Sequence, residues 1–312
     1  MRAVSARAVT IVVRATLRMT ARRCVQRRPL GAPVASPHGP RRAWYTPVMD
    51  LGLRSRTVLV TGSTAGIGYA AARQFAAEGA HVVLNGRAPE RVERALAALR
   101  TEVPGATLEG VAADVSTAAG CEAIVERVPD VDVLINNAGV FAPRAFEDIT
   151  DAEWLTFFQT NVMSGVRLAR HYLRGMLARN WGRIVFVSSE SGLQIPVEMI
   201  HYGMTKTAQL AVARGLAERA RGTGVTVNSV LPGPTASEGV ATFVRELATQ
   251  QGITFAEMEK QFFATARPSS LLGRFETPDE IAAMIVFVAS AVASGTTGAA
   301  LRVDGGVLRS IA

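Results

Sequence analysis

The stretch TVLVTGSTAGIGYAAARQFAAEGAHVVLN, residues 57–85, predicts a strand, a glycine-rich turn, a helix and a second strand in direct succession. The runs TVLVT and HVVLN are short and rich in β-branched residues, and the helical pattern between them ends at Gly79. The turn TGSTAGIG places Gly62, Gly66 and Gly68 where the first strand passes into the helix. Because these positions have no Cβ, backbone N–H groups and the positive end of the helix can face a pyrophosphate.

Strands and helices continue to alternate through the rest of the chain. Further strands are predicted at 107–114, 131–139, 183–189, 225–231 and 299–303, and further helices at 89–100, 121–128, 151–179, 199–221 and 278–290. The strands are continuously apolar, as in a parallel sheet that helices cover on both faces. The predicted fold is therefore a single α/β domain with a doubly wound parallel sheet, the Rossmann fold. Its ligands should lie beyond the carboxyl ends of the strands.

A long excursion interrupts the alternation between about residues 233 and 277. It is too long for a simple loop and contains two amphipathic helical patterns, at 238–251 and 254–266. An insert at the ligand edge is expected to act as a helical lid over the substrate. Its phenylalanines indicate either an apolar cover or plain core: Phe243, Phe255, Phe262 and Phe263.

Charge divides the chain into two parts. The net charge is +8, but the first 50 residues hold ten arginines and one acidic residue, Asp50, which leaves 24 basic and 25 acidic residues beyond it. The nearly neutral body carries no electrostatic footprint for nucleic acid. We therefore distinguish an arginine-rich extension, residues 1–48, from a catalytic domain, residues 49–312.

The extension allows three interpretations. Arg14 and Arg18 interrupt its longest apolar run, so it predicts neither a membrane span nor an ordinary signal peptide. It fits an arginine-rich organellar presequence. It also fits a segment that is disordered or absent from the mature protein, because Met49 opens MDLGLRSRTVLVTG, a natural start for such a domain, and this interpretation is favoured. The third is an appendage that binds a membrane surface or nucleic acid beside a vestigial enzyme.

The two cysteines add little. Cys24 lies in the extension and Cys121 is expected to open a helix, and neither has a second cysteine or a metal-binding spacing near it. The pattern suits a reducing compartment. We expect a cytoplasmic protein without a metal site.

A tyrosine and a lysine stand four residues apart in HYGMTK, residues 201–206, on a predicted helix. Lys206 is one of two lysines in a chain with 32 arginines, which indicates a task that a guanidinium performs badly. Residues four apart share one face of a helix. A fixed ammonium beside Tyr202 should lower the pKa of the phenol from about 10 and make the phenol a usable proton donor and acceptor. The same ammonium can also bind sugar hydroxyls.

Five motifs occur together in a recognisable order: TGSTAGIG (61–68), Asp114-Val115, NNAG (136–139), VSSESG (187–192) and YGMTK (202–206). They resemble the motifs of the classical short-chain dehydrogenase/reductase family, in particular of its members that reduce ketoacyl groups on acyl carrier protein. The resemblance spans about residues 54–307. It implies NAD(P)-dependent interconversion of a ketone and a secondary alcohol, with Tyr202 as general acid in reduction and general base in oxidation.

The resemblance also implies roles for the residues around this pair. Ser189, thirteen residues before Tyr202, holds the substrate oxygen. Ser188 competes for that role, but successive strand residues point to opposite sides, and the spacing of the family favours Ser189. Asn161 helps to hold a water molecule in the proton path. His201 points about 100° away from Tyr202 on the helix, so we interpret it as pocket wall or surface.

The end of the second strand favours NADP(H) over NAD(H). An NAD site usually carries Asp or Glu there, whereas this sequence has Asn85, Gly86 and Arg87, and Arg87 can clamp a 2′-phosphate. Against this, Ala65 stands where many NADP-using relatives have a basic residue, so NAD(H) remains the other candidate. The residues expected to bind the cofactor are Gly62, Ser63, Thr64, Ala65, Gly66, Ile67, Gly68, Arg87, Asp114, Val115, Asn137, Ala138, Gly139, Tyr202, Lys206, Pro232, Gly233 and Thr235.

Within that set the resemblance assigns Asp114 to the adenine amino group, residues 137–139 to the adenosine ribose and Thr235 to the nicotinamide carboxamide. An asparagine in a turn can instead satisfy local backbone groups, so the role of Asn137 stays open.

The substrate is expected to be a small carbonyl compound or alcohol of unspecified class. Arg167, Arg170 and Arg174 could offer an acyl carrier protein a basic ridge on one helix, although a solvated face is the simpler interpretation. The resemblance suggests a homo-oligomer, either a tetramer or a dimer. The alternative function is an NADP-binding sensor or regulatory protein without turnover. Such proteins tend to lose the tyrosine or the lysine, and both are present here.

Overall fold

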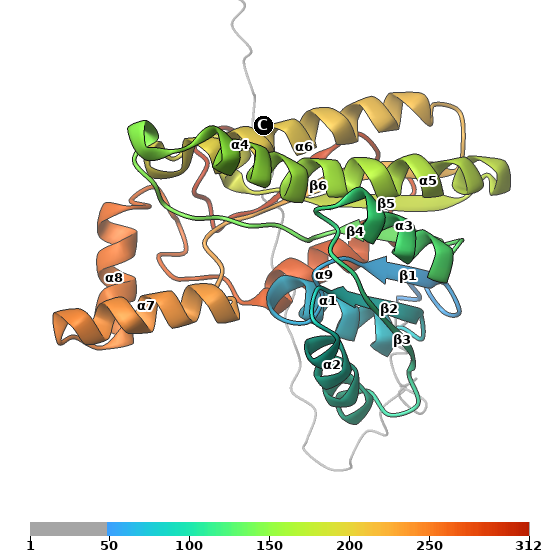
Figure 1. Cartoon of the computed structure of the whole chain (residues 1–312), viewed down its shortest axis with the longest axis horizontal. Helices are drawn as coiled ribbons and strands as arrows, with labels where there is room; N and C mark the ends of the chain where they lie inside the picture. The colour runs from blue at the N-terminus through green and yellow to red at the C-terminus, as the bar shows by residue number, and fades with distance from the viewer. Residues whose placement is uncertain (1–48, 312) are drawn as a thin grey trace, which may run out of the picture. The chain divides into compact units, whose positions relative to one another are not determined.

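Seven parallel strands form one sheet in the order β3-β2-β1-β4-β5-β6-β7 (Figure 1). The computed structural model describes residues 49–311, so the extension 1–48, with Cys24 and its three interpretations, lies outside the described residues. The strands are β1 (Thr57–Val60), β2 (His81–Gly86), β3 (Thr107–Ala112), β4 (Val133–Asn136), β5 (Gly182–Val187), β6 (Val225–Pro232) and β7 (Ala300–Val303). The predicted doubly wound α/β fold is confirmed.

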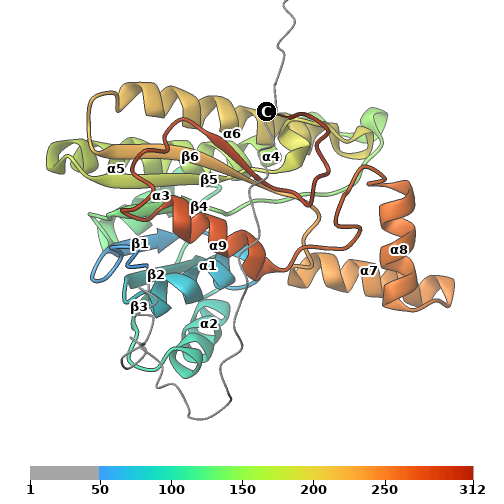
Figure 2. The same cartoon turned by 180° about the vertical axis from the view of Figure 1, so that it is seen from behind.

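Helices cover both faces of the sheet, because the central strands β1, β4, β5 and β6 are apolar and buried on both sides. Val58 and Val60 of β1 pack into one core with α1 (Gly66–Ala77), α2 (Pro89–Glu102) and α9 (Pro278–Val288). Leu59 between them points into a second core with α3 (Ala118–Arg127), α5 (Ser164–Arg179) and α6 (Ile200–Arg219), as the two-residue period of a strand requires. Figure 2 shows α1 and α9 side by side on the face opposite α5 and α6.

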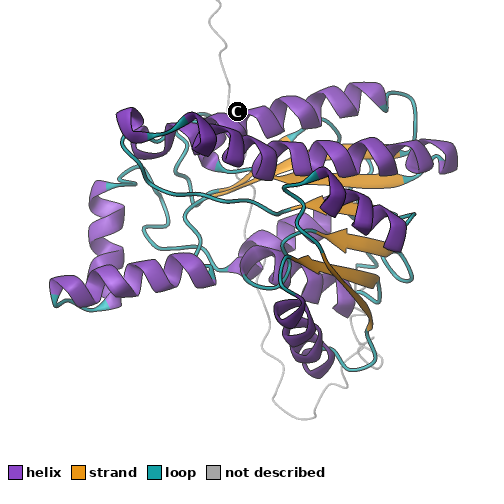
Figure 3. Ribbon diagram, viewed as in Figure 1, coloured by secondary structure: helices purple, strands orange, loops and turns teal. Residues whose placement is uncertain are grey.

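The predicted excursion forms two helices, α7 (Glu238–Gln251) and α8 (Phe255–Thr265). In Figure 3 the strand arrows point towards the side on which these two helices lie. They pack on a small core of their own, which contains Val244, Ala248, Met258, Phe263 and Phe275. The insert is therefore attached at the edge of the sheet where a doubly wound fold binds its ligands.

The phenylalanines of the insert take both of the roles left open. Phe263 is buried in the core of the insert, with Phe255 and Phe262 packed against it. Phe262 also lines the cavity described below. The side chain of Phe243 lies outside what the structure describes.

The long helical region predicted from 151 to 179 contains a wider turn. It consists of α4 (Asp151–Phe158), a π-helical turn (Gln159–Met163) and α5. Turns of this kind are frequent at functional sites, because they redirect one side chain without ending the helix. Short 3-10 turns lie at Phe146–Asp148, Glu190–Gly192 and Val197–Met199.

The expectation that Cys121 opens a helix is wrong. Helix α3 begins at Ala118, because the side chain of Thr117 accepts a hydrogen bond from the N–H of Gly120 and caps the helix one turn earlier. Cys121 is buried and has a free thiol. Within residues 49–311 we find no helix with the length and hydropathy of a transmembrane span.

Candidate active site

A cavity of about 790 Å³ opens between the carboxyl ends of the strands and the helical insert. Its wall combines the glycine turn before α1, the ends of β4, β5 and β6, the first turns of α6 and the inner side of α7 and α8. It therefore brings together segments that the sequence singled out separately.

The glycine turn has the geometry of a phosphate cradle. Gly62 and Gly66 have φ values of +62° and +58°, which L side chains rarely adopt. A Cβ at Gly68 would lie 2.4 Å from Nδ2 of Asn137. Helix α1 begins at Gly66 without a side-chain cap and without an acidic residue in its first turn, so its N–H groups remain directed at the cavity. These features fit the pyrophosphate of a dinucleotide.

Most of the predicted cofactor residues line this cavity. They are Ala65, Gly66, Ile67, Gly68, Asn137, Gly139, Tyr202, Lys206, Pro232, Gly233 and Thr235. The others are not part of its wall: Gly62, Ser63, Thr64, Arg87, Asp114, Val115 and Ala138. The roles of this second group towards a cofactor stay predictions.

Three polar residues of that set hydrogen-bond to the protein's own backbone. Ser63 is fully buried, and its hydroxyl donates to the carbonyl of Val60 over 2.7 Å. Asn137 donates through Nδ2 to the carbonyl oxygens of Thr61 (2.9 Å) and Gly62 (3.1 Å). The side chain of Asn137 thus supports the glycine turn, which is the alternative left open for it. One oxygen of Asp114 accepts the N–H of Ser116 over 3.0 Å.

The end of β2 presents arginine and no acidic side chain. Asn85 is buried, and its Nδ2 donates to the carbonyl oxygens of Val111 and Ala113, both over 3.1 Å. Arg87 follows it at the surface. Arg91, which the sequence reasoning did not single out, lines the cavity and pairs with Glu238 of α7 over 3.5 Å. Its position in the first turn of the predicted helix, four residues after Arg87, was the available signal.

Three of the four predicted catalytic residues, Ser189, Tyr202 and Lys206, lie just after β5 and in the first turns of α6. Lys206 is buried, with Nζ 5.5 Å from the ring centroid of Tyr202. Its ammonium donates to the carbonyl of Val187 over 2.9 Å. Ser188 uses its hydroxyl to donate to the carbonyl of Lys206 over 2.8 Å. Ser189 points the other way, and its hydroxyl donates to the carboxylate of Glu190 in the cavity wall.

Burial governs the pKa values of the tyrosine and the lysine. Burial lowers the pKa of Lys206 from 10.5 to about 7, against the opposing charge of Glu190. Burial also raises the pKa of Tyr202 above its ordinary value, and the charge of Glu190 raises it further, while a hydrogen bond with Ser189 and the charge of Arg267 lower it. The expected lowering of the Tyr202 pKa by Lys206 is therefore not observed. A physical reason is that an amine with a pKa of about 7 carries only part of its charge at neutral pH.

Asn161 lies in the π-helical turn and does not line the cavity. Its side chain binds both backbone groups of Val140 and donates to Oγ1 of Thr205 over 2.9 Å. Its backbone carbonyl accepts Nε2 of Gln209 over 2.6 Å, and Oε1 of Gln209 accepts the ammonium of Lys206 over 3.2 Å. Gln209 thus connects Lys206 to Asn161. The sequence reasoning missed it, although it stands three residues after Lys206 on the same helix.

The expectation that His201 forms pocket wall or surface is wrong. His201 is 1% exposed and packs against Phe157 of α4, with the ring centroids 4.0 Å apart. Burial lowers the pKa of its imidazole. It is a core residue between α4 and α6, because the face of α6 next to Tyr202 turns towards α4.

Glu190 and Arg267 are two further residues that the sequence reasoning did not identify. Nε of Arg267 lies 3.2 Å from Oε1 of Glu190, and Nη1 lies 3.3 Å from Oε1 of Glu198. All three residues line the cavity next to Ser189. A charged residue directly after the end of an apolar strand was a signal for Glu190. Arg267 has no local signal.

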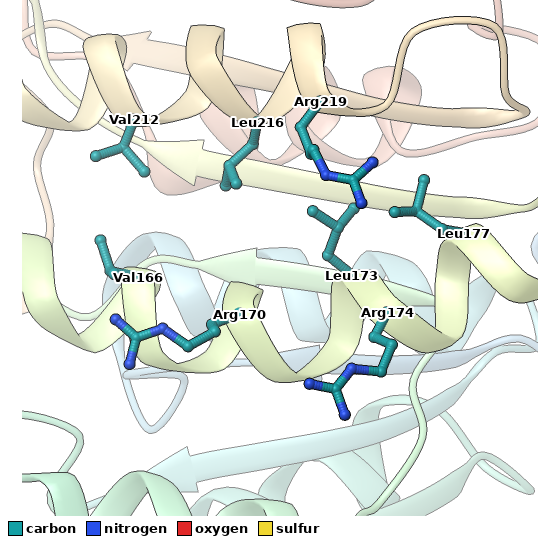
Figure 4. A pocket seen from close by; sticks show the side chains of 8 residues that line it. All are labelled: Val166, Arg170, Leu173, Arg174, Leu177, Val212, Leu216 and Arg219. Atoms are coloured by element: carbon teal, nitrogen blue, oxygen red, sulfur yellow. The ribbon is translucent and has the colours of Figure 1, made fainter.

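The three arginines of the predicted basic ridge do not act as a unit. Arg167 donates to the carbonyl of Ser116 over 3.2 Å and to the side chain of Gln159. Arg170 and Arg174 are exposed and, with Arg219, surround an otherwise apolar groove between α5 and α6 (Figure 4). The groove shares no lining residue with the cavity at the strand ends. Binding of a carrier protein and an oligomeric state stay predictions.

Comparison with known proteins identifies the family. The family model described as short chain dehydrogenase matches residues 56–248. An uncharacterized oxidoreductase of Bacillus subtilis, YvaG, is 46% identical over 84% of this chain and 100% of its own length. The 3-oxoacyl-[acyl-carrier-protein] reductase FabG of Aquifex aeolicus is 31% identical over 83% of this chain and 100% of its own length.

A solved structure agrees with these relatives. L-sorbose reductase of Gluconobacter frateurii, complexed with NADPH and L-sorbose, superposes with a TM-score of 0.79 and 32% identity, and covers 84% of this chain and 100% of that one. The chain belongs to the short-chain dehydrogenase family of oxidoreductases, and the resemblance inferred from the five motifs is confirmed.

Proposed function

We propose that this family member is an NADP(H)-dependent oxidoreductase that interconverts a ketone and a secondary alcohol. The observation that carries the proposal is the convergence of Ser189, Tyr202 and Lys206 on the cavity that also contains the glycine turn. A dinucleotide held at that turn and along residues 232–235 would supply the hydride. A sensor without turnover would not need the tyrosine, the lysine and the serine in one cavity.

Each residue has a task that its position supports. Ser189, at the end of β5, holds the substrate oxygen within reach of Tyr202. Tyr202 donates its proton to that oxygen in reduction and removes it in oxidation. Lys206 binds the ribose hydroxyls and, in its protonated form, adds positive charge near the phenol. Gln209 and Asn161 hold Lys206 in place through consecutive hydrogen bonds.

Replacing Tyr202 by phenylalanine tests the assignment. Tyr202→Phe removes the proton donor but keeps the ring, so kcat should fall by about 10²- to 10⁴-fold while the Kd for NADPH changes little. Tyr172→Phe is the matched control, because Tyr172 donates to the carbonyl of Val128 in the other core, away from the cavity. A Tyr202→Phe enzyme with normal turnover on its best substrate would show that another group delivers the proton.

The preference for NADP(H) rests on the arginines beyond β2. Arg87 is exposed there without an acidic neighbour on the strand end, and Arg91 lines the cavity. Arg87→Asp should weaken NADPH about tenfold or more and NADH much less, because a charge-assisted hydrogen bond to the 2′-phosphate is lost. Arg100→Asp, in the last turn of α2, is the control. Equal weakening of both nucleotides by Arg87→Asp would contradict the clamp.

A further inference from the structure

We infer that Glu190, held in place by Arg267, is a specificity determinant that selects neutral substrates with a hydroxyl group next to the carbonyl carbon. The inference rests on the proposed function, because it takes Ser189 as the group that holds the substrate oxygen. Four observations support it: the contacts of Glu190, its position relative to Ser189, the charge of its surroundings and the apolar wall opposite.

Glu190 is a buried carboxylate with unused hydrogen-bonding capacity. Its side chain is 6% exposed and that of Arg267 is 11% exposed. Oε1 accepts Nε of Arg267 over 3.2 Å, and Oε2 accepts the N–H of Ser191 over 2.8 Å and the hydroxyl of Ser189. The two oxygens of a carboxylate can accept about four hydrogen bonds. Ser189 has a single O–H, so when it donates to a substrate oxygen it releases Oε2 of Glu190, which can then accept one further donor from the cavity.

The position of that free acceptor determines which donor can use it. A substrate oxygen held by Ser189 lies about 2.8 Å from Oγ, so it lies within about 5 Å of the Oε2 atom that Ser189 already contacts. A hydroxyl on the carbon next to the carbonyl can lie between the carbonyl oxygen and Oε2 of Glu190. It can then donate to Glu190 while the carbonyl oxygen stays at Ser189 and Tyr202.

The charges around Glu190 favour neutral groups over anions. Glu190 and Glu198 both pair with the single guanidinium of Arg267, so the cluster has a formal charge of −1. Lys206 also lines the cavity, but in the proposed complex its ammonium would be hydrogen-bonded to the cofactor ribose. A carboxylate next to the carbonyl would face this cluster in a low-dielectric environment and be repelled.

The rest of the substrate faces the apolar inner side of the insert. Val244, Leu247, Met258 and Phe262 line that side of the cavity. A molecule with a polar hydroxy-ketone end and an uncharged remainder fits this division.

A purely structural role for the Glu190–Arg267 ion pair is the alternative, and buried ion pairs contribute little to stability on balance. A structural pair would affect all ketone substrates equally.

Three probes that share one acetyl group separate the two possibilities. Hydroxyacetone, butanone and pyruvate differ only in the group next to the carbonyl, which is a hydroxymethyl, an ethyl or a carboxylate. We expect kcat/KM of the wild type to decrease in that order. Glu190→Gln keeps one acceptor oxygen and should lower the ratio of kcat/KM for hydroxyacetone to kcat/KM for butanone about tenfold. Glu190→Met should lower this ratio further.

The outcome with pyruvate gives an independent readout. The ratio of kcat/KM for pyruvate to kcat/KM for butanone should rise in Glu190→Gln, because the cluster of residue 190, Glu198 and Arg267 becomes neutral. Glu218→Gln, an arginine-paired glutamate at the end of α6 and outside the cavity, should leave all ratios unchanged. An unchanged ratio of hydroxyacetone to butanone in Glu190→Gln, or an equal loss with both ketones, would overturn the inference. A wild type that turns over none of these ketones with NADPH or NADH would instead count against the proposed function.

Discussion

Replacing Lys206 by methionine should reveal the depressed pKa of this amine as a pH-dependent difference in stability. Lys206 is 5% exposed, and burial lowers its pKa to about 7. Methionine has a similar length and no charge, so it removes the titration and leaves the shape nearly intact. The variant also leaves the carbonyl of Val187 and Oε1 of Gln209 without this donor, which adds a cost that does not depend on pH.

The magnitude follows from proton binding in the two states. Between pH 7 and 10.5 the unfolded chain binds the proton of Lys206 and the folded chain does not. The free energy of unfolding of the wild type therefore rises by about 1.4 kcal/mol per pH unit from this group, and by about 5 kcal/mol across the interval. The methionine variant lacks this rise. The free energy of unfolding of the variant minus that of the wild type should be largest below pH 7 and should decrease as the pH increases.

Urea unfolding of the protein without nucleotide, at pH 6.5 to 9.5 in steps of about one unit, measures the difference directly. The other groups are the same in both proteins, so the pH-dependent part of the difference reports on Lys206 and on the charge coupled to it, that of Glu190. Lys260 provides the matched control, because it is the other lysine of the chain and is exposed on α8. A difference between Lys206→Met and wild type that stays constant with pH would refute the reasoning, since the amine would then titrate alike in the folded and unfolded chains.

Three further predictions concern the glycine turn, a buried acid and the support of Lys206. Gly68→Ala should destabilise the fold and weaken NADPH binding, because the new Cβ would lie 2.4 Å from Nδ2 of Asn137. The control is Gly215→Ala in α6, where a Cβ meets nothing within 4 Å; it should raise the free energy of unfolding by up to about 1 kcal/mol, as measured by thermal or urea unfolding. Burial raises the pKa of Glu276 to about 7, so between pH 4.5 and 7 the folded chain holds a proton that the unfolded chain has released. The free energy of unfolding of the wild type should therefore fall as the pH rises through this range, and urea unfolding of Glu276→Gln should lack this contribution. Gln209→Leu removes an acceptor of the Lys206 ammonium and should move the alkaline limb of the kcat–pH profile to lower pH; an unchanged profile would exclude this support.

Strong local patterns made most of the fold predictable. Helix α7 coincides with the predicted range 238–251, and the long α4–α5 region begins and ends at the predicted residues 151 and 179. Both rest on periodicity and on capping residues that act within one turn. The start of α3 was misplaced, because its cap, Thr117, lies outside the apolar pattern that marked the helix.

The candidate site was predictable where its chemistry is local in sequence. The glycine turn needs residues without a Cβ, and the Tyr202–Lys206 pair needs only the pitch of one helix, so the order of residues along the chain is enough to reveal both. His201 was misjudged, since its environment depends on how α6 packs against α4. The pKa of Tyr202 was misjudged for the same reason, because burial depends on all the segments around the cavity.

The sequence by itself determined the doubly wound sheet, the glycine turn and the tyrosine–lysine pair, because each arises from residues close together in the chain. The tertiary structure alone decided what surrounds them. It brought Arg267 to Glu190 across 77 residues and joined the side chain of Gln209 to the carbonyl of Asn161 across 48. Such contacts depend on how the insert and the helices pack on the sheet, and no local pattern records that packing.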